Sequence, residues 1–364
     1  MKILIDINHP AHVHYFRNFI KLMEAKGHQF CVINRDSKMI NQLLDYYGIE
    51  HTIRNKRPDK KGTFVSMQNL LQMTLWCIRK SYSFRPDMYV GFANIPCAIS
   101  SRLFRKPCVL LNDTEHNLIS HKIYMPNCDA VLTPFYFETD LDKLVGGKKI
   151  KQVRFNGYIE QLYLHSKDYR HNDNVLNELN VKPKEYVIVR YIAYNAHHDK
   201  GIIPLSHGVR RQLVAEISLH YKVFVSLEEE FDMDFYSQYL LNISPEKMHD
   251  LMAEAKFLIT EGATMASEAF VLGVPYLYLN PLKCGNIDYQ CNHYPERCFQ
   301  TTDAEEAKDD VKSLMQLECN QDICRREVET ETIRPTEYLC WFVENFPKSR
   351  TVMKENPDYQ YKFR

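Results

Sequence analysis

The sequence predicts an α/β protein with two doubly wound domains, each a parallel sheet covered by helices on both faces. Short apolar runs alternate with helix-length amphipathic segments along almost the whole chain, which is the pattern of parallel sheets. The 364 residues exceed the usual size of one domain, and 45% of them are hydrophobic, which supports a sizeable core. A polar, tyrosine-rich stretch at 157–184 interrupts the alternation and predicts a linker there.

The first domain is predicted to span residues 1–156. Its expected strands cover 2–7, 29–34, 87–91, 107–111, 130–132 and 152–155. Its expected helices cover 12–26, 37–47, 64–84 and 95–104. Gly27 and Gly48 follow the first two helices, and glycine commonly closes a helix because it adopts the left-handed conformation without strain. Pro96 stands in the first turn of the last helix, where its missing N–H is not needed.

The second domain is predicted to span residues 185–345. Its expected strands cover 186–191, 222–226 and 256–260. Its expected helices cover 205–220, 245–255, 264–272, 303–317 and 335–345. Ser244 and Pro245 indicate a helix start, since serine caps free N–H groups and proline suits the first helical position. Ligands of doubly wound sheets bind outside the carboxyl ends of the strands, so residues that follow strands are the candidates for a site.

Charge and composition exclude several classes of protein. Lysine plus arginine and aspartate plus glutamate both number 46, so no net charge favours nucleic acid. The chain opens on a strand pattern rather than a secretory signal, and no apolar run approaches the roughly 20 residues that span a bilayer. Eleven cysteines without CxxC spacing are typical of reduced thiols. We therefore expect a cytoplasmic protein without a nucleic-acid partner.

The most informative segment is 260–275 (TEGATMASEAFVLGVP), where a strand ends in a small-residue turn and a short helix follows. A glycine turn at a helix N-terminus forms a site for phosphate, because free N–H groups and the helix dipole both favour negative charge. Glu268, about one turn into the helix, can accept hydrogen bonds from sugar hydroxyls. The alternative is an ordinary strand–helix unit whose glycine only makes the turn.

Three histidines follow the first strand in residues 6–16 (DINHPAHVHYF). A histidine at this position can act as a general base near neutral pH, and a nearby helix N-terminus favours its neutral form. His12 is our candidate. The alternatives are a metal site, for which no matching Cys or His pair occurs elsewhere, and a purely structural role with His9 as a cap and His14 packed in the helix.

Arg190 ends the first strand of the second domain, and residues 195–201 (NAHHDKG) follow shortly after. A buried arginine needs an anionic partner, and a diphosphate is a natural one. His197 or His198 can add a hydrogen bond to the same oxygens. The alternative is a structural ion pair between Arg190 and Asp199.

Two carboxylates, Asp113 and Glu115, follow another strand in residues 112–117 (NDTEHN). Either can bind acceptor hydroxyls or take a catalytic proton. Alternatively, Asp113 only caps the next segment.

Residues 54–61 (RNKRPDKK) form a basic run that precedes apolar positions such as Leu71 and Trp76. A solvated loop before a core helix is the more common explanation. The alternative is peripheral contact with an anionic membrane surface, at the inner face of the cell membrane, that carries a lipid-linked acceptor.

Several of these segments resemble nucleotide-sugar enzymes. Residues 260–275, with 248–252 (MHDLM) before them, are similar to the donor-site motif of the GT-B superfamily, which includes MurG-like glycosyltransferases and non-hydrolysing UDP-GlcNAc 2-epimerases. A closer resemblance, over most of residues 1–280, is to a GT-B family known only as a domain of unknown function. The segments that carry this resemblance are 9–16, 190–199, 113–116 and 157–165.

The resemblance implies a GT-B fold, in which two Rossmann-like, doubly wound domains face an interdomain cleft. It also implies that the last helix, around 334–345, or the tail at 346–364 returns to the first domain. In the donor site, Glu268 would hold the ribose hydroxyls of a uridine nucleotide. The backbone N–H groups of Gly262, Ala263 and Thr264 would line its diphosphate.

For the first domain, the resemblance implies catalytic roles. His12 falls where MurG-like enzymes have a Gly-His-Val loop whose histidine faces the reacting centre. Glu115 falls near a strand end where the epimerases carry a catalytic glutamate. The epimerases also use an aspartate one strand earlier, but the matching stretch here, 90–94 (VGFAN), has no carboxylate. Epimerisation by elimination needs an acid and a base, so transfer is favoured. The glycine-rich loop of MurG is also replaced, by residues 8–11.

The sequence therefore predicts a metal-independent GT-B glycosyltransferase that moves a sugar from a nucleotide-activated donor, a UDP-sugar by resemblance, to a hydroxyl acceptor. The acceptor is expected to be a carbohydrate or a lipid-linked one, in surface polysaccharide or glycolipid synthesis. His12 would deprotonate it, while Arg190, His198 and the helix N-terminus stabilise the leaving diphosphate. No cofactor is expected. The alternatives are an NDP-sugar 2-epimerase and a non-catalytic nucleotide-sugar-binding protein.

Overall fold

The computed structural model describes residues 1–54, 63–147, 151–194 and 202–364, with the side chains of 63–66 excepted. The described residues divide into two compact units. The first contains Met1–Tyr163 and Thr332–Arg364, and the second contains Leu164–Glu331.

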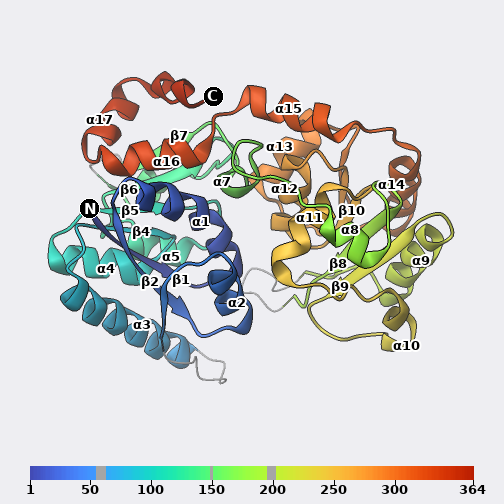
Figure 1. Ribbon diagram of the computed structural model, residues 1–364, viewed down its shortest axis with the longest axis horizontal. Helices are drawn as coiled ribbons and strands as arrows, with labels where there is room; N and C mark the ends of the chain where they lie inside the picture. Colours follow the sequence, from blue (N-terminus) through green and yellow to red (C-terminus); the bar gives the residue numbers. More distant parts are fainter. Residues whose placement is uncertain (55–62, 148–150, 195–201) are drawn as a thin grey trace. The chain divides into compact units, whose positions relative to one another are not determined.

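In the first unit, the described strands form one parallel sheet of seven strands in the order β3-β2-β1-β4-β5-β6-β7 (Figure 1). Its strands are β1 (Lys2–Ile7), β2 (Gln29–Arg35), β3 (His51–Arg54), β4 (Met88–Phe92), β5 (Cys108–Leu111), β6 (Ala130–Pro134) and β7 (Gln152–Phe155). Its helices are α1 (Pro10–Ala25), α2 (Lys38–Tyr46), α3 (Thr63–Phe84), α4 (Ile95–Phe104), α5 (Leu118–Tyr124), α6 (Leu141–Leu144), α7 (Gln161–Leu164, whose last residue belongs to the second unit), α16 (Pro335–Glu344), α17 (Lys348–Glu355) and the 3₁₀ helix η4 (Pro357–Phe363).

In the second unit, the described strands form a parallel sheet of five in the order β12-β11-β10-β8-β9. The strands are β8 (Tyr186–Tyr191), β9 (Lys222–Leu227), β10 (Leu258–Thr260), β11 (Tyr276–Tyr278) and β12 (Cys298–Gln300). The helices are α8 (Asn174–Leu179), α9 (His207–Ser218), α10 (Met233–Tyr236), the 3₁₀ helices η2 (Ser237–Tyr239) and η3 (Pro245–Lys247), α11 (Met248–Ala253), α12 (Ala263–Val271), α13 (Gly285–His293), α14 (Ala304–Gln316) and α15 (Gln321–Glu331).

The central strand β1 shows why this sequence folds as a doubly wound sheet. It is apolar on both faces, and every residue after Lys2 is buried, as expected for a strand with helices on either side. Ile5 lies beside Val32 of β2 on one edge and beside Val90 of β4 on the other. The chain therefore changes direction across the sheet at β1, which places the loops after β1 and β4 at the switch point.

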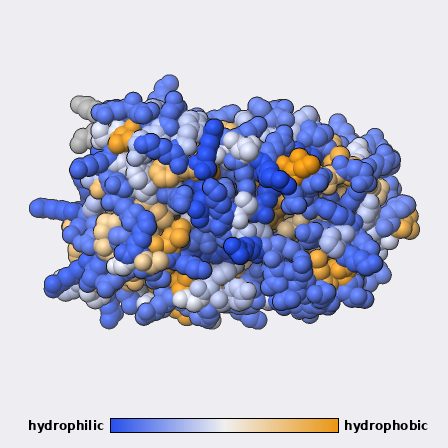
Figure 2. All heavy atoms as spheres, turned by 45° about the horizontal axis from the view of Figure 1, so that its top comes forward, coloured by the Kyte–Doolittle hydropathy of each residue, from blue (hydrophilic) through white to orange (hydrophobic). Residues whose placement is uncertain are grey.

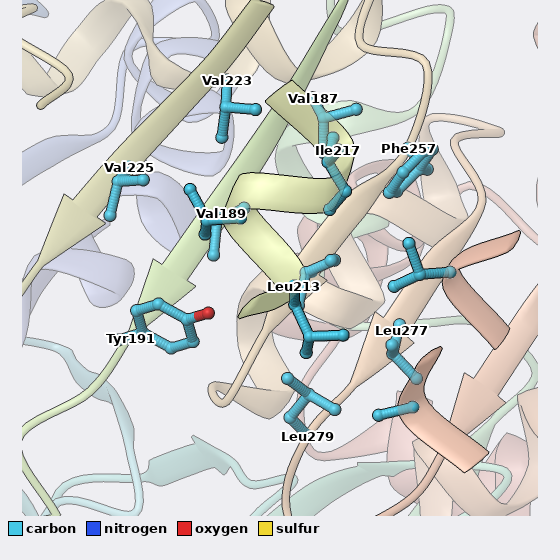
Figure 3. Packing of buried hydrophobic residues seen from close by; sticks show 14 of the residues in the cluster. Val187, Val189, Tyr191, Leu213, Ile217, Val223, Val225, Phe257, Leu277 and Leu279 are labelled. Carbon is cyan, nitrogen blue, oxygen red and sulfur yellow. The ribbon is translucent and has the colours of Figure 1, made fainter. Parts of the chain in front are cut away.

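The core of the second unit is formed by aliphatic side chains from β8, β9 and β11 packed against α9 and α14. Figure 3 shows Leu213 and Ile217 of α9 beside Val187 and Val189 of β8, in the same cluster as side chains from the neighbouring strands. The branched side chains of β8 are fully buried, which matches the near-continuous apolar runs of parallel sheets. This core fixes the strand ends on which the candidate site depends.

The C-terminal segment from Thr332 onward belongs to the first unit. The side chain of Gln161 donates to the Thr332 hydroxyl at 2.7 Å, and the Thr336 hydroxyl donates to the carbonyl of Leu162 at 2.9 Å. Gly157 allows a close approach, because a Cβ at this position would lie 2.9 Å from the ring of Pro335. The return therefore includes α16, which is one of the two alternatives that the resemblance implied, although the domain bounds predicted from the sequence kept residues up to 345 in the second domain. The stretch predicted as a linker, 157–184, contains α7 and α8.

Most of the elements expected from the sequence are confirmed, including the strands at 2–7, 152–155 and 186–191. The strands β11 and β12 were not predicted, because three residues are too few to show a periodicity. The helix α15 was missed because it is almost entirely polar, with Val328 as its buried residue.

The face drawn in Figure 2 is mainly hydrophilic, with small, separate apolar areas. In the part of the chain that the structure describes, none of the helices combines the length and the apolar character that crossing a bilayer requires.

Gly273 provides a test of packing at the end of α12. It has φ +78°, and a Cβ there would clash with the backbone carbonyl of Gln321 in α15. We expect Gly273→Ala to lower the free energy of unfolding by more than about 2 kcal/mol in urea titrations, because neither backbone can yield. The control is Gly27→Ala, where φ is +85° but no atom lies within 4 Å of the added Cβ. Equal losses in the two variants would mean that the contact with α15 contributes nothing.

Candidate functional site

The candidate nucleotide site of the second unit lies where its sheet changes direction. β8 pairs with β9 on one side and with β10 on the other, so the loops after β8 and β10 lie at the switch point. Glu261 and Gly262 follow β10 directly, and Ile192 is the first residue after β8. The N–H of Ile192 donates to the Glu261 carboxylate at 3.0 Å, which ties the two loops together.

The helix α12 opens this site with free backbone N–H groups. Its N-cap is Gly262, which has no side chain to accept from the first turn. The N–H of Gly262 donates to the hydroxyl of Thr260 at 3.0 Å, so the turn is held by the strand end. Ala263 and Thr264 form the first turn, and Thr264 is exposed. An anion that approached this terminus would meet unshared donors and the positive end of the helix dipole.

Glu268 lies in the second turn of α12 and is largely buried, at 6% exposure. Its carboxylate contacts Nε2 of His249 in α11 at 3.0 Å. The sequence placed Glu268 about one turn into the helix, which is close to its observed position. A buried carboxylate with a fixed orientation is suited to accept hydrogen bonds from a pair of hydroxyls.

Arg190 has an anionic partner within the protein. Its guanidinium donates to the Ser226 hydroxyl and to the Glu228 carboxylate, both at 2.6 Å. Glu228 also accepts from the N–H of Ala193 at 3.3 Å. The sequence analysis considered Asp199 as the structural partner and His197 and His198 as companions of Arg190, but these three residues lie outside the described part of the chain.

A buried ion pair between Glu261 and Arg210 supports the whole switch point, and the sequence analysis did not identify it. The exposure of the two side chains is 0% and 4%. Asn280, after β11, donates to the backbone carbonyl of Glu261 at 2.9 Å. The signal in the sequence was a carboxylate next to the turn glycine, in a position that follows a buried strand.

The first unit has an equivalent buried pair at its own switch point. Asp6 at the end of β1 is 1% exposed and lies 3.4 Å from the Arg54 guanidinium. The Asn94 amide donates to the backbone carbonyl of Asp6 at 3.0 Å and to its carboxylate at 3.2 Å. Burial raises the pKa of Asp6, whereas Arg54, Asn94 and Asn8 lower it.

His12 lies in the first turn of α1, next to this pair, and is enclosed by aromatic rings. Its ring centroid is 4.9 Å from that of Phe92 and 5.8 Å from that of Tyr15. Burial lowers the pKa of His12 to about 3, and His9 contributes to the shift. The imidazole is therefore neutral, as the sequence predicted, but it is a weak proton acceptor.

The other two histidines of this loop have structural roles. The ring of His9 accepts from the N–H of Ala11 at 3.2 Å and caps α1, and His14 stacks on Tyr163 at 5.3 Å. Within the described residues, no group of three or more His, Cys, Asp or Glu side chains is arranged to hold a metal ion.

Asp113 follows β5 and is partly exposed. Its carboxylate accepts from the Thr114 hydroxyl at 3.0 Å. Burial raises the pKa of Asp113 to about 6, and Glu115 raises it further, whereas the Thr114 bond lowers it. The capping role considered for Asp113 is filled by other residues, because Asn112 accepts from the Thr114 N–H and Asn117 caps α5.

Glu115 is committed to the protein backbone. One carboxylate oxygen accepts from the N–H of Glu138 at 2.5 Å and from that of Thr139 at 3.0 Å. Two backbone bonds hold the side chain against the loop after β6, which is a structural use of this carboxylate.

Aromatic residues after β6 and β7 complete the surroundings of Asp113. The rings of Tyr136 and Tyr158 lie 5.3 Å apart. Burial raises the pKa of the Tyr136 phenol, and the carboxylates of Glu160 and Asp113 beside it raise it further. This group of carboxylates and rings was not predicted, because its members come from three separate loops.

The two ion pairs at the second switch point allow a matched test. We expect Glu261→Gln to lower the free energy of unfolding by about 3 kcal/mol, because it leaves the buried Arg210 without a counter-charge. Glu228→Gln removes the partly exposed partner of Arg190, and the expected loss is below about 1 kcal/mol. Urea unfolding of both variants measures the difference, and similar losses would contradict the supporting role of the buried pair.

The chain is similar to known proteins in sequence and in fold. Uncharacterized protein MJ0665 of Methanocaldococcus jannaschii is 22% identical over 302 residues, which cover 79% of this chain and 84% of that protein. The UDP-N-acetylglucosamine 2-epimerase of Rickettsia bellii has a similar structure, with a TM-score of 0.65, 11% identity, and coverage of 97% of this chain and 98% of its own. MurG of Acinetobacter baumannii gives a TM-score of 0.56 with 14% identity over 95% of this chain and 100% of its own.

These likenesses show that the chain has the GT-B fold, with two Rossmann-like units. The solved structures that it resembles are glycosyltransferases and epimerases. A family model matches residues 1–334 of the chain. The protein belongs to the family described as protein of unknown function DUF354.

Proposed function

We propose that this chain is a GT-B glycosyltransferase that moves a sugar from a UDP-sugar to a hydroxyl of a carbohydrate or lipid-linked acceptor. The observation that carries the proposal is the N-terminus of α12, which has glycine as its cap and a buried carboxylate, Glu268, in its second turn. The names of the solved neighbours, a UDP-N-acetylglucosamine 2-epimerase and MurG, support a nucleotide sugar as the substrate.

The second unit would bind the donor. The N–H groups of Ala263 and Thr264 would receive the diphosphate, whereas that of Gly262, expected from the sequence to do the same, already donates to the Thr260 hydroxyl. Glu268 would accept from the ribose hydroxyls. Arg190 would add positive charge by exchanging its bond to Glu228 for one to a phosphate oxygen, since that pair is partly exposed. His198 would assist it, as the sequence predicts.

The first unit would bind the acceptor and supply the general base. Three candidates were expected, and their environments separate them. The pKa of His12 is lowered to about 3, and Glu115 is held by two backbone N–H groups. Asp113 is partly exposed, as His12 is, but its pKa is raised to about 6, which suits a base that works near neutral pH. We therefore assign the base to Asp113 and a wall of the acceptor site to His12.

The proposed reaction is a displacement at the anomeric carbon. Asp113 takes the proton of the acceptor hydroxyl while the oxygen of that hydroxyl forms a bond to the anomeric carbon. The bond between the carbon and the diphosphate oxygen breaks, and the nucleotide diphosphate leaves with the electron pair. Its charge would be stabilised by the N-terminus of α12 and by Arg190.

A 2-epimerase is the competing function, and two positions argue against it. The stretch 90–94, which by resemblance matches the turn that carries an aspartate in the epimerases, has no carboxylate. Its Asn94 caps α4 by accepting from the N–H of Cys97 at 2.8 Å and also holds Asp6. Glu115, the second matching position, is bound to the backbone. Neither position supplies a free acid or base, which favours transfer.

Calorimetric titration with UDP tests the donor site. We expect Glu268→Ala to weaken UDP binding at least about tenfold, because two charge-assisted hydrogen bonds to the ribose are lost. His249→Ala is the control, since it removes the neighbour of Glu268 but keeps the carboxylate. Undiminished affinity in Glu268→Ala would remove the ribose role, and equal weakening in both variants would make that role structural.

The pH dependence of turnover tests the base. We expect kcat/KM to rise with pH through about 6 and then to level off, because Asp113 must be deprotonated to accept a proton. Asp113→Asn should lower kcat by about 100-fold or more and abolish that limb.

The matched variant is His12→Ala, in which we expect more than about a tenth of the wild-type turnover to remain. If kcat falls further in His12→Ala than in Asp113→Asn, His12 is the general base and the assignment to Asp113 is wrong.

A further inference from the structure

The helix α3 of the first unit exposes large apolar side chains and buries several polar ones. Four large apolar residues on it, Met67, Leu71, Leu75 and Tyr82, are between 55% and 78% exposed. Their spacing of four and seven residues places them on one face of the helix. They extend over about 22 Å, at 1.5 Å per residue.

The buried positions of the same helix are partly polar. Asn69, Thr74 and Ser81 are each less than 10% exposed. The hydroxyls of Thr74 and Ser81 donate to carbonyls of their own helix, at 2.8 and 2.7 Å, so burial leaves neither unsatisfied. A surface helix normally turns its polar residues to water and its large apolar residues inward. In α3, large apolar residues face outward, which marks a surface that meets something other than water.

The charged residues of α3 and of the neighbouring helix α4 are all cationic. Neither α3 nor α4, which packs beside it, contains an aspartate or a glutamate (Figure 1). Residues 63–106 contain six cations and one acid, Asp87. That acid already accepts from the N–H of Lys2 at 2.9 Å and lies 3.8 Å from the Lys106 ammonium. The cations are Arg79, Lys80, Arg85, Arg102, Arg105 and Lys106.

Two of these arginines occupy positions that favour glycine. Arg85 follows α3 with φ +54°, and Arg105 follows α4 with φ +52°. Glycine adopts this conformation without strain, whereas a residue with a Cβ does not. Both arginines are exposed, and Leu103 beside the second one is also exposed, at 61%. The chain therefore retains long cationic side chains at two helix ends where the backbone favours glycine.

We propose that the outer face of α3, with the cationic ends of α3 and α4, binds an anionic phospholipid surface. Met67, Leu71, Leu75 and Tyr82 would enter the boundary between headgroups and acyl chains, while the arginines attract the lipid phosphates. The sequence suggested such a contact for the basic run at 54–61 together with the apolar positions after it. Residues 55–61 of that run lie outside the described part of the chain, so the proposal rests on α3 and on the cationic ends of α3 and α4. It deepens the proposed function, because it favours a lipid-linked acceptor.

Sedimentation of the full-length chain with vesicles tests this surface. We expect it to bind vesicles of phosphatidylcholine mixed with phosphatidylglycerol, and to bind vesicles of phosphatidylcholine alone much more weakly. Leu71→Ser combined with Leu75→Ser should weaken binding to the anionic vesicles at least about tenfold, because two inserted side chains are lost. The control pairs two other exposed residues, Ile119→Ser with Leu219→Ser, and should bind like the wild type.

A second variant separates charge from folding. Arg85→Gly combined with Arg105→Gly should weaken vesicle binding and reduce its dependence on salt. Its Tm should not fall, because glycine suits both left-handed positions. Unchanged binding in this variant or in the leucine variant would overturn the proposal.

Analytical ultracentrifugation separates the lipid surface from a second copy of the chain. A wild-type dimer that the leucine substitutions dissociate would assign the face to that copy and contradict the lipid assignment. Vesicle binding is measured without a nucleotide sugar, so a protein that does not bind vesicles can still catalyse the proposed transfer. Equally, a protein that binds vesicles but shows no turnover contradicts the transfer reaction and not the lipid surface.

Discussion

Each unit of this protein depends on a buried carboxylate–arginine pair at the point where its parallel sheet changes direction. In the second unit, Glu261 pairs with Arg210 and also holds the loop after β8 through the Ile192 N–H. In the first, Asp6 pairs with Arg54 and is held by Asn94. Charges buried in this way must be compensated, so the loops that supply the partners cannot move independently. The strand ends that carry the candidate site are thereby fixed.

The two units use this constraint for different chemistry. In the second, the fixed loop leaves the N-terminus of α12 without a side-chain cap and places Glu268 one turn deeper, an arrangement suited to a nucleotide diphosphate. In the first, Asp113, Tyr136 and Glu160 come together from the ends of β5, β6 and β7. Burial raises the pKa of Asp113, and burial beside Phe92 and Tyr15 lowers the pKa of His12. Burial therefore favours Asp113 over His12, the base that the sequence favours.

Much of the fold was predictable because parallel sheets have a strong pattern. Strands such as β1 and β8 are continuous apolar runs, and the helix after β10 begins at a glycine and ends at another. The site was less predictable. Local signals gave the position of Glu268 and of the turn before α12 in the fold. The partners of Glu261 and Arg190 are distant in sequence, and nothing in residues 112–117 distinguishes Asp113 from Glu115. Exposure of an apolar face, as on α3, also depends on which side of the helix the sheet covers.

The central claim is sugar transfer rather than epimerisation, and isotope exchange tests it most directly. The protein would be incubated in deuterium oxide with a panel of UDP-sugars, with and without a membrane lipid extract as the source of acceptor. The account predicts that UDP is released only when the extract is present and that the donor sugar gains no deuterium at its C2 position. Deuterium at C2 in the absence of an acceptor would show that the protein is an epimerase.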